Sequence, residues 1–309
     1  MTGHCMRVIF MGTSSFGVPT LQALIDNNCK VVGVYTQPPR PAGRGKKLRM
    51  SPIGLFAQKH DLKLRFPEDF SSSFEISEFE SLQPDIVIVV AYGLILPKKL
   101  LTISKFKFFN IHASLLPRWR GAAPIQRALL AGDKKTGISI IELEPSLDTG
   151  PIVLQRYLAI ESYDNMGTIY EKLSHIGANL IGELFKTIQT PSFVAQGSEG
   201  VKYAKKIEKS ETQIDWCNGA RAIDCKVRAF SPSPGAWFAL EGERIKILAC
   251  QVSNGAGDPG VVLDEYFQVA CGNGSIFPTV LQRAGKSPLN ATEFLRGYKA
   301  PVGVTLIKC

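Results

Sequence analysis

The most constraining feature of this sequence is a run of five isoleucine and valine residues at 86–90. A strand with one face in water alternates apolar and polar residues, whereas a strand buried on both faces of a parallel sheet is apolar throughout. Shorter apolar runs at 7–12 and 30–36 precede it, and apolar residues at helical spacing occupy 18–27 between them. The chain therefore begins as strand, helix and strand around a buried parallel sheet.

The same alternation continues to about residue 190. Further strands are predicted at 62–64 and 137–143, further helices at 52–60, 122–131 and 165–187, and a polar surface stretch at 69–77. Strands that alternate with helices predict an α/β fold with a Rossmann-like, doubly wound parallel sheet. The turn at 12–17 has neither the G-x-G-x-x-G fingerprint nor the Lys-Ser/Thr of a phosphate loop, which argues against a nicotinamide oxidoreductase.

The character of the sequence changes near residue 190. Residues 191–209 lack periodicity and are predicted to be a linker. A helix at 220–230 follows, and then short strands between glycine turns at 236–240, 244–251, 260–264, 267–270 and 275–281. This pattern predicts a smaller carboxyl-terminal β-barrel domain of OB-like type. We expect an amino-terminal domain over 1–190, the linker over 191–209 and the barrel domain over 210–309.

Composition indicates where such a protein works. The net charge of +9 favours a polyanionic partner without specifying one. The seven cysteines are scattered without a C-x-x-C pair and there are only four histidines, so we expect reduced thiols and no metal site. The longest apolar run, 86–96, is about half of a membrane span, and no signal peptide is expected. These features predict a soluble cytoplasmic protein without a membrane partner.

A basic loop follows the second predicted strand, over residues 37–49. Its prolines and glycines predict no regular structure. It contains five cations and no acidic residue: Arg40, Arg44, Lys46, Lys47 and Arg49. A charge run of this kind is usually a solvated surface loop, but its glycines would also allow a close approach to phosphate groups.

Two polar side chains mark the end of another predicted strand, after the aromatic run at 106–109. Successive side chains of a strand point to opposite faces, so Asn110 and His112 share one face. In an open parallel sheet, ligands bind beyond the carboxyl ends of the strands, where this amide and imidazole would lie. A capping asparagine and a satisfied histidine would explain such a pair equally well. Asp148, before Thr149 and Gly150, could likewise be no more than a turn residue.

These segments together resemble the enzymes that use 10-formyltetrahydrofolate. The resemblance is carried by Asn110-x-His112-x-Ser114-Leu115-Leu116-Pro117 and by Asp148-Thr149-Gly150. The basic loop at 40–47 and the run at 119–126 are similar to those of methionyl-tRNA formyltransferases, and 203–207, 214–216 and 228–230 look like the carboxyl-terminal domain of that family. The resemblance extends from residue 6 to about residue 298.

The resemblance implies transfer of a formyl group from 10-formyltetrahydrofolate, a co-substrate, to the α-amine of methionyl initiator tRNA. Asn110 would donate to the tetrahedral oxyanion, and His112 would move a proton from the attacking nitrogen to the leaving one. Asp148 would accept a hydrogen bond from the imidazole and so determine its tautomer. No metal is implied, and we expect a monomer.

The resemblance also assigns residues to the two substrates. The folate would contact Ser114, Leu115, Leu116 and Pro117, together with an apolar loop that contains Tyr92, Gly93 and Leu94. The tRNA would contact Arg40, Arg44, Lys46, Lys47, Lys205 and Lys206, with Arg44 in the leading role. Trp216, Phe230 and Trp237 could stack on bases, although core packing is the alternative that we favour for Phe230 and Trp237.

Two other functions stay open at this stage. A formyltransferase of the same folate class could act on a small amine, such as a nucleotide sugar or ribonucleotide, but a small substrate has no need of five cations in one loop. A non-catalytic RNA-binding module on a decayed Rossmann-like fold is disfavoured because Asn110, His112 and Asp148 are all present.

Overall fold

A computed structural model describes residues 5–42, 45, 47–103, 107–189, 193–298 and 301–306. Contacts divide the chain into two compact units that are discontinuous in sequence. The first unit comprises Met1–Gly121, Thr136–Leu158 and Tyr170–Tyr203, and the second comprises Ala122–Lys135, Ala159–Ile169 and Ala204–Cys309. The division at 191–209 stays a prediction about domain organisation, and residues 193–203 pack with the first unit.

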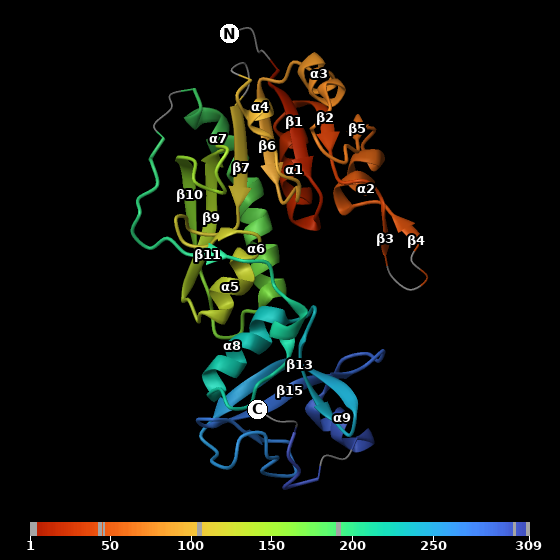
Figure 1. The fold of residues 1–309 in the computed structure, drawn as a ribbon, viewed down its shortest axis with the longest axis vertical. Helices are drawn as coiled ribbons and strands as arrows, with labels where there is room; N and C mark the ends of the chain where they lie inside the picture. The colour runs from red at the N-terminus through yellow and green to blue at the C-terminus, as the bar shows by residue number, and fades with distance from the viewer. Residues whose placement is uncertain are drawn as a thin grey trace. The chain divides into compact units, whose positions relative to one another are not determined.

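The first unit is built on a seven-stranded sheet (Figure 1). Its strand order is β10-β9-β7-β6-β1-β2-β5. The strands are β1 (Arg7–Gly12), β2 (Lys30–Tyr35), β5 (Leu64–Arg65), β6 (Ile86–Val90), β7 (Lys107–His112), β9 (Lys135–Glu142) and β10 (Ile152–Ala159). All pairings from β7 to β5 are parallel, whereas β9 pairs with β7 in the antiparallel sense. The predicted doubly wound sheet is confirmed and is mostly parallel, with β10 as a strand that the sequence did not indicate.

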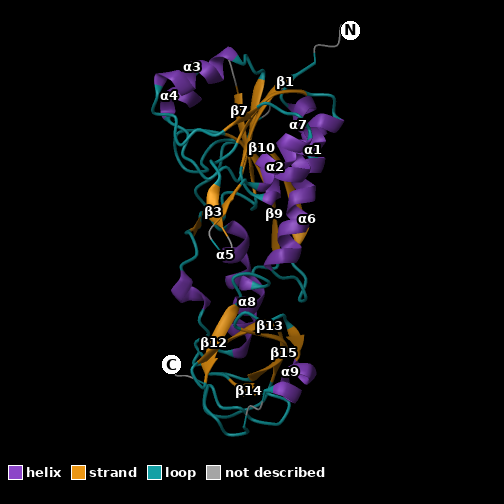
Figure 2. Cartoon of the chain, turned by 90° about the vertical axis from the view of Figure 1, so that its right-hand side faces the viewer, coloured by secondary structure: helices purple, strands orange, loops and turns teal. Residues whose placement is uncertain are grey.

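Helices cover both faces of this sheet (Figure 2), with α1, α6 and α7 on one side and α3 and α4 on the other. The helices of the first unit, with one that crosses into the second, are α1 (Val18–Asp26), α2 (Pro52–Lys59), α3 (Ser73–Ser81), α4 (Lys98–Leu101), α6 (Met166–Asn179) and α7 (Ile181–Thr187), and a 3-10 turn, η1 (Ser15–Gly17), precedes α1. The single helix predicted at 165–187 is thus two helices. The polar surface stretch predicted at 69–77 was wrong, because α3 begins there: Ser72 caps it through Phe74 N–H, and Ile76 and Phe79 are buried.

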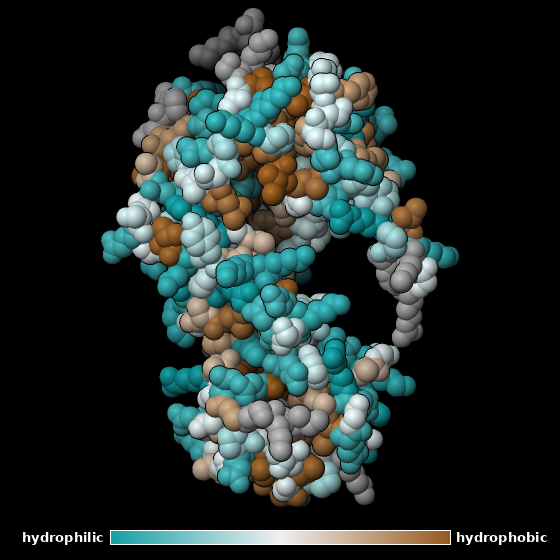
Figure 3. All heavy atoms as spheres, viewed as in Figure 1, coloured by the Kyte–Doolittle hydropathy of each residue, from teal (hydrophilic) through white to brown (hydrophobic). Residues whose placement is uncertain are grey.

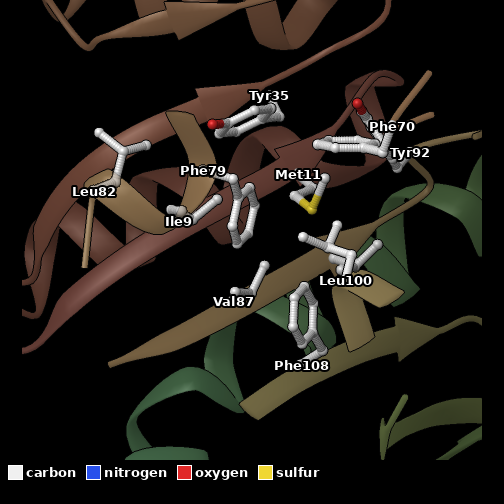
Figure 4. Close-up of a cluster of buried hydrophobic side chains, with 11 residues drawn as sticks. Ile9, Met11, Tyr35, Phe70, Phe79, Leu82, Val87, Tyr92, Leu100 and Phe108 are labelled. Carbon is white, nitrogen blue, oxygen red and sulfur yellow. The ribbon is translucent and has the colours of Figure 1, made fainter. Parts of the chain in front are cut away.

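A hydrophobic cluster lies between the sheet and α3 and α4 (Figure 4). Side chains of β1, β6 and β7 contribute Ile9, Val87 and Phe108, and Phe79 and Leu100 come from the two helices. The rings of Phe79 and Phe108 stack with their centroids 5.9 Å apart. Because side chains alternate along β7, Phe108 shares its face with positions 110 and 112, so this cluster lies beneath the predicted site residues.

The second unit, predicted to be a smaller β-barrel domain, contains an antiparallel sheet. Its elements are α5 (Pro124–Leu130), η2 (Lys209–Thr212), α8 (Ala220–Phe230), β12 (Ala236–Leu240), β13 (Glu243–Ser253), β14 (Val269–Ala270), β15 (Ser275–Arg283), β16 (Leu289–Asn290) and α9 (Ala291–Gly297). Trp216 and Phe230 are fully buried, and the Trp237 indole donates to the Thr212 hydroxyl under the Arg244 guanidinium. Of the three aromatic residues considered for base stacking, Trp216 and Phe230 therefore pack in the core, as expected for Phe230.

Short strands complete the chain and correct one expectation. The loop at 37–49, predicted to lack regular structure, forms an antiparallel hairpin of β3 (Arg40–Ala42) and β4 (Lys47–Arg49). The remaining short strands are β8 (Arg120–Gly121) and β11 (Tyr203–Ala204). Hydrophilic and hydrophobic residues are interspersed over the face shown in Figure 3. In the part of the chain that the structure describes, no helix has both the length and the apolar composition to cross a membrane.

The cysteines depart from expectation at one position. Cys217 is disulfide-bonded, so the prediction of reduced thiols throughout was wrong there. Among the described residues, Cys5, Cys29, Cys225 and Cys271 are free thiols, and Cys250 is a fifth. Burial raises the pKa of Cys29 and of Cys271 to about 11, which keeps both as neutral thiols near neutral pH.

Candidate functional site

The carboxyl end of β7 presents two of the predicted site residues. Asn110 is opposite Val89 of the parallel strand β6, so the loops that follow β6 and β7 leave the sheet at the same edge. Between the two site residues, Ile111 faces α6, where a Cβ on Gly177 would lie 3.0 Å from the Ile111 side chain. Asn110 and His112 therefore point to the opposite face, as the alternation of a strand requires.

Asp148 reaches this pair from the loop between β9 and β10. Its Oδ1 accepts a hydrogen bond from Asn110 Nδ2 at 3.3 Å, and its Oδ2 accepts one from the backbone N–H of Gly121 at 2.8 Å. Its Oδ2 lies 3.7 Å from His112 Nδ1, and both side chains are more than 90% buried. The structure thus brings together the three residues that the sequence singled out.

The imidazole of His112 has a different hydrogen-bond partner from the one expected. Its Nε2 lies 2.8 Å from the carbonyl oxygen of Trp119, whereas 3.7 Å is too long for a hydrogen bond between Nδ1 and Asp148. A carbonyl oxygen only accepts, so Nε2 carries a proton in this arrangement. Trp119, rather than Asp148, therefore determines the tautomer here, and Nδ1 faces the carboxylate.

Three loops around the site hold non-glycine residues in the left-handed region of backbone space. They are Ala91 after β6 (φ 47°), Trp119 after β7 (φ 66°) and Asp148 after β9 (φ 51°). Such conformations cost roughly 1–3 kcal/mol each and tend to gather at functional sites. Gly150, two residues after Asp148, has no room for a side chain, because a Cβ there would collide with the carbonyl oxygen of Glu142.

The loop predicted to bind folate, 114–117, is braced from β9 and β10. The Ser139 hydroxyl donates to Ser114 O at 2.7 Å and accepts from Leu116 N–H at 3.0 Å. The Gln155 amide donates to Leu116 O and to the Ser139 hydroxyl, both at 2.9 Å. Ser114 and Leu116 are buried, while Leu115 and Pro117 are half-buried, so only the latter two offer substantial side-chain surface.

The second loop predicted to contact folate offers mainly backbone. The Tyr92 side chain packs in the hydrophobic cluster (Figure 4), and burial raises the pKa of its phenol, so it supplies no acid or base. Its carbonyl oxygen accepts from Thr13 Oγ1 at 2.7 Å and from Gln37 Nε2 at 3.0 Å. Gly93 is exposed with φ 80°, and Leu94 is half-buried against the same cluster.

The predicted tRNA contacts fall in both units. Arg40 and Lys47 are exposed on the β3–β4 hairpin, which extends away from the sheet in Figure 1, whereas Arg44 and Lys46 lie outside the described residues. Lys205 and Lys206 are exposed in the second unit. Their carbonyl oxygens accept from the guanidinium of Arg127, at 3.1 and 3.3 Å.

Comparison with known proteins decides the family. Residues 6–184 match the family described as "Formyl transferase", and residues 206–299 match "Formyl transferase, C-terminal domain". This chain belongs to the formyl transferase family. A methionyl-tRNA formyltransferase of Ruegeria pomeroyi is 46% identical over 97% of this chain and all of its own length, and one of Paramagnetospirillum magneticum is 43% identical over 97% of this chain and all of its own length.

Solved structures share the fold of this formyl transferase. An N-formyltransferase from Helicobacter canadensis, in complex with folinic acid and dTDP-3-aminofucose, aligns with a TM-score of 0.68 at 18% identity, over 90% of this chain and 99% of its own. HypX from Aquifex aeolicus in complex with tetrahydrofolic acid aligns with a TM-score of 0.61 at 17% identity over 94% of this chain. This chain spans about half of HypX, 47% of its length.

Two residues that the sequence did not single out, Gln196 and Arg120, form a hydrogen-bonded network at the loop that carries Asp148 in this formyl transferase. Gln196 donates to the carbonyl oxygens of Asp148 and Gly150, and it accepts from the side chain of Arg120. Arg120 lies in the run at 119–126 that carried part of the resemblance, but Gln196 lies in a stretch without periodicity and had no signal.

Among the described residues, no group of three or more His, Cys, Asp or Glu side chains could hold a metal ion.

Proposed function

We propose that this formyl transferase moves the formyl group of 10-formyltetrahydrofolate to the α-amine of methionyl initiator tRNA. The observation that carries the proposal is full-length similarity: methionyl-tRNA formyltransferases are 43–46% identical over about 97% of this chain. The juxtaposed Asn110, His112 and Asp148 supply a site for acyl transfer. Such an enzyme works where translation begins, in keeping with the cytoplasmic location that the sequence predicts.

Asn110 is assigned to the oxyanion. The amine attacks the formyl carbon, and the carbonyl oxygen becomes negatively charged as a tetrahedral intermediate forms. An asparagine amide has two N–H donors, and one of them is directed at Asp148 Oδ1. We assign the second N–H to the oxyanion, a contact of the kind that contributes about 10²–10³ in turnover.

His112 and Asp148 are assigned to proton transfer. An α-amine has a pKa of about 7.7–8.0, so a useful fraction is already neutral near pH 7. After attack, Nδ1 of His112 takes the proton from the new ammonium nitrogen, since Nε2 is protonated and directed at Trp119 O. The Asp148 carboxylate, 3.7 Å away, stabilises the imidazolium. His112 then gives the proton to N10 as the bond from carbon to N10 breaks, releasing formyl-methionyl-tRNA and tetrahydrofolate.

Recognition of tRNA is assigned to cationic residues in both units. On the hairpin, Arg40 and Arg49 are directly opposite each other across the two strands. Like charges in this position destabilise a strand pair, and phosphate groups of a bound nucleic acid would remove that penalty. Arg44 and Lys46 extend the same predicted cationic loop, and Lys205 and Lys206 add charge from the second unit.

Transfer of labelled formyl tests the proposal. The enzyme is incubated with labelled 10-formyltetrahydrofolate and, in separate reactions, methionyl initiator tRNA, methionyl elongator tRNA and free methionine. We expect label on the initiator species alone. Absence of label from initiator tRNA while the enzyme still binds the folate would overturn the tRNA assignment. It would favour a small amine, such as a nucleotide sugar or ribonucleotide, as the acceptor.

A further inference from the structure

Gln196 makes four hydrogen bonds around the loop that carries Asp148. Its Nε2 donates to Asp148 O and to Gly150 O, both at 2.8 Å. Its Oε1 accepts from Arg120 Nε at 3.0 Å and from Arg120 Nη2 at 2.7 Å. Two donors and two acceptor positions are all that a glutamine amide has, so this side chain is fully used.

The orientation of this amide is unambiguous. Carbonyl oxygens can only accept and a guanidinium can only donate, so Nε2 must face the turn at 148–150 and Oε1 must face Arg120. Arg120 is 9% exposed. Flipping the amide would place its oxygen against two carbonyl oxygens and its N–H groups against the buried guanidinium of Arg120. Each of these donor or acceptor mismatches is costly in free energy.

These contacts close a ring around the Asp148 carboxylate. Arg120 holds Gln196, and the next residue, Gly121, donates its N–H to Asp148 Oδ2 at 2.8 Å. Gln196 in turn holds the backbone on both sides of Thr149. Gln196 therefore holds the backbone of Asp148, and Gly121 holds its carboxylate.

The segment that carries Gln196 is itself attached to the first unit. Val194 and Ile152 exchange both backbone hydrogen bonds, at 2.8 and 2.9 Å, and Arg120 N–H donates to Lys202 O at 2.9 Å. The amide of Gln196 is thus presented from a segment held on both sides. Asp148 has φ 51°, and such a conformation persists where surrounding contacts determine it.

We propose that Gln196 is a positioning residue for formyl transfer, which fixes the Asp148–Gly150 turn so that the carboxylate faces His112 and Asn110. The inference rests on the proposed function and adds a residue to its site. Gln196 touches no reacting group. It acts on the rate of the chemical step through Asp148, and it leaves the braced folate loop at 114–117 unchanged.

Two substitutions distinguish the hydrogen bonds to Arg120 from those to the turn at 148–150. Gln196→Met keeps the approximate volume and removes all four hydrogen bonds. Gln196→Glu keeps the acceptor for Arg120 but replaces the two donors that hold the turn. Since a misplacement of about 1 Å can cost about 10²-fold in rate, we expect both variants to lower kcat by about 10- to 100-fold, with the KM for folate within twofold of wild type.

Gln268→Met is the matched control. Gln268 is a half-buried glutamine of the second unit whose Nε2 donates to Ser275 Oγ at 2.7 Å. We expect it to lower the melting temperature by an amount comparable to Gln196→Met while kcat stays within twofold. If the control loses kcat as Gln196→Met does, or if Gln196→Glu retains wild-type kcat, the positioning role is wrong.

A second readout does not depend on catalysis. Amide hydrogen exchange of Gly121 reports whether its N–H still donates to Asp148. We expect exchange at Gly121 to be at least tenfold faster in Gln196→Met than in wild type, and unchanged in Gln268→Met. Equal exchange in all three proteins would overturn the inference. If the wild-type enzyme fails to formylate methionyl-tRNA while exchange at Gly121 still differs among the three proteins as expected, only the proposed substrate is refuted.

Discussion

The loops around Asp148 and the β3–β4 hairpin are built in opposite ways. At the site, His112 and Asp148 are more than 90% buried, and side chains from distant parts of the sequence hold the loops. On the hairpin, Arg40, Lys47 and Arg49 are exposed, and Leu48 is 71% exposed. Only strand pairing between Arg40–Ala42 and Lys47–Arg49 organises the hairpin residues that the structure describes.

This difference matches the proposed roles. Stabilising the charge that develops in the transition state requires hydrogen-bond donors that are already in place, because reorganisation of the site during the reaction lowers the rate. Binding a polyanion requires accessible cations, whose contribution depends on charge more than on geometry. We therefore expect substitutions at the site to act mainly on kcat or on folate, and substitutions on the hairpin to act on tRNA and to depend on salt.

The largest effect is expected for Asn110→Asp. The new carboxylate would oppose the developing oxyanion and would lie beside Asp148 Oδ1, 3.3 Å from the present amide nitrogen. We expect kcat to fall by at least about 10²-fold, as when an oxyanion donor is lost. The thermal melt should show that the protein still folds. Asn290→Asp, at the amino-terminal cap of α9, is the control, since aspartate caps a helix equally well. Near-normal turnover in Asn110→Asp would remove Asn110 from the mechanism.

Ser139→Ala should act on folate rather than on tRNA. The change leaves the Leu116 N–H without its acceptor, and an unsatisfied buried group costs roughly 1–3 kcal/mol. We expect the KM for 10-formyltetrahydrofolate to rise about fivefold or more, measured at saturating tRNA. Thr136→Val is the control on the same strand: its buried hydroxyl has no hydrogen-bond partner among the residues that the structure describes, so its loss should change nothing. A matching rise in KM for both variants would mean that the 114–117 loop is not involved.

Arg40→Gln is expected to weaken tRNA use by a few-fold. The plot of log affinity against log salt concentration should also become less steep by about one unit of slope, as for the loss of one phosphate contact. Folate affinity should not change. Lys186→Gln, an exposed cation at the last turn of α7, is the control. An unchanged salt slope in Arg40→Gln would argue that the hairpin does not contact phosphate.

The smallest effect is expected for Glu211→Gln. Glu211 pairs with Arg127, the residue that also binds the carbonyl oxygens of Lys205 and Lys206. Hydrogen bonding from Arg127 holds the pKa of Glu211 below its ordinary value. Because the folded-state pKa is depressed, the stabilisation is present above the ordinary pKa of about 4.3 and is lost as the pH falls through the lower folded value.

Thermal or urea unfolding of Glu211→Gln checks this. The pair is partly exposed, so we expect the variant to lose no more than about 1 kcal/mol of unfolding free energy at pH 7. The difference between the two proteins should shrink as the pH falls below the ordinary pKa of about 4.3 and through the lower folded value. A difference that stays constant from pH 7 to pH 3 would show that the charge of Glu211 contributes nothing. This partly buried pair is intermediate between the site and the hairpin.

Periodicity predicted most of the elements because it is a local property. The apolar run at 86–90 is β6, buried at every position, and 220–230 and 236–240 are α8 and β12 as predicted. One expectation was wrong because tertiary packing overrides composition: a helix begins within the serine-rich stretch at 69–77, since Ile76 and Phe79 enter a core. The hairpin was missed for a different reason, because residues 40–42 pair locally with 47–49 despite the proline at 41.

The sequence by itself determined the α/β architecture, the strand-rich character of the second unit and the choice of Asn110, His112 and Asp148 as candidate site residues, because these depend on spacing and on side-chain chemistry. Only the tertiary structure decided how those side chains are held. Trp119 O engages His112, Ser139 braces Leu116, and Gln196 fixes the turn at Asp148. The last contact joins residues 48 positions apart, and such hydrogen bonds have no local signature, since folding alone brings their partners together.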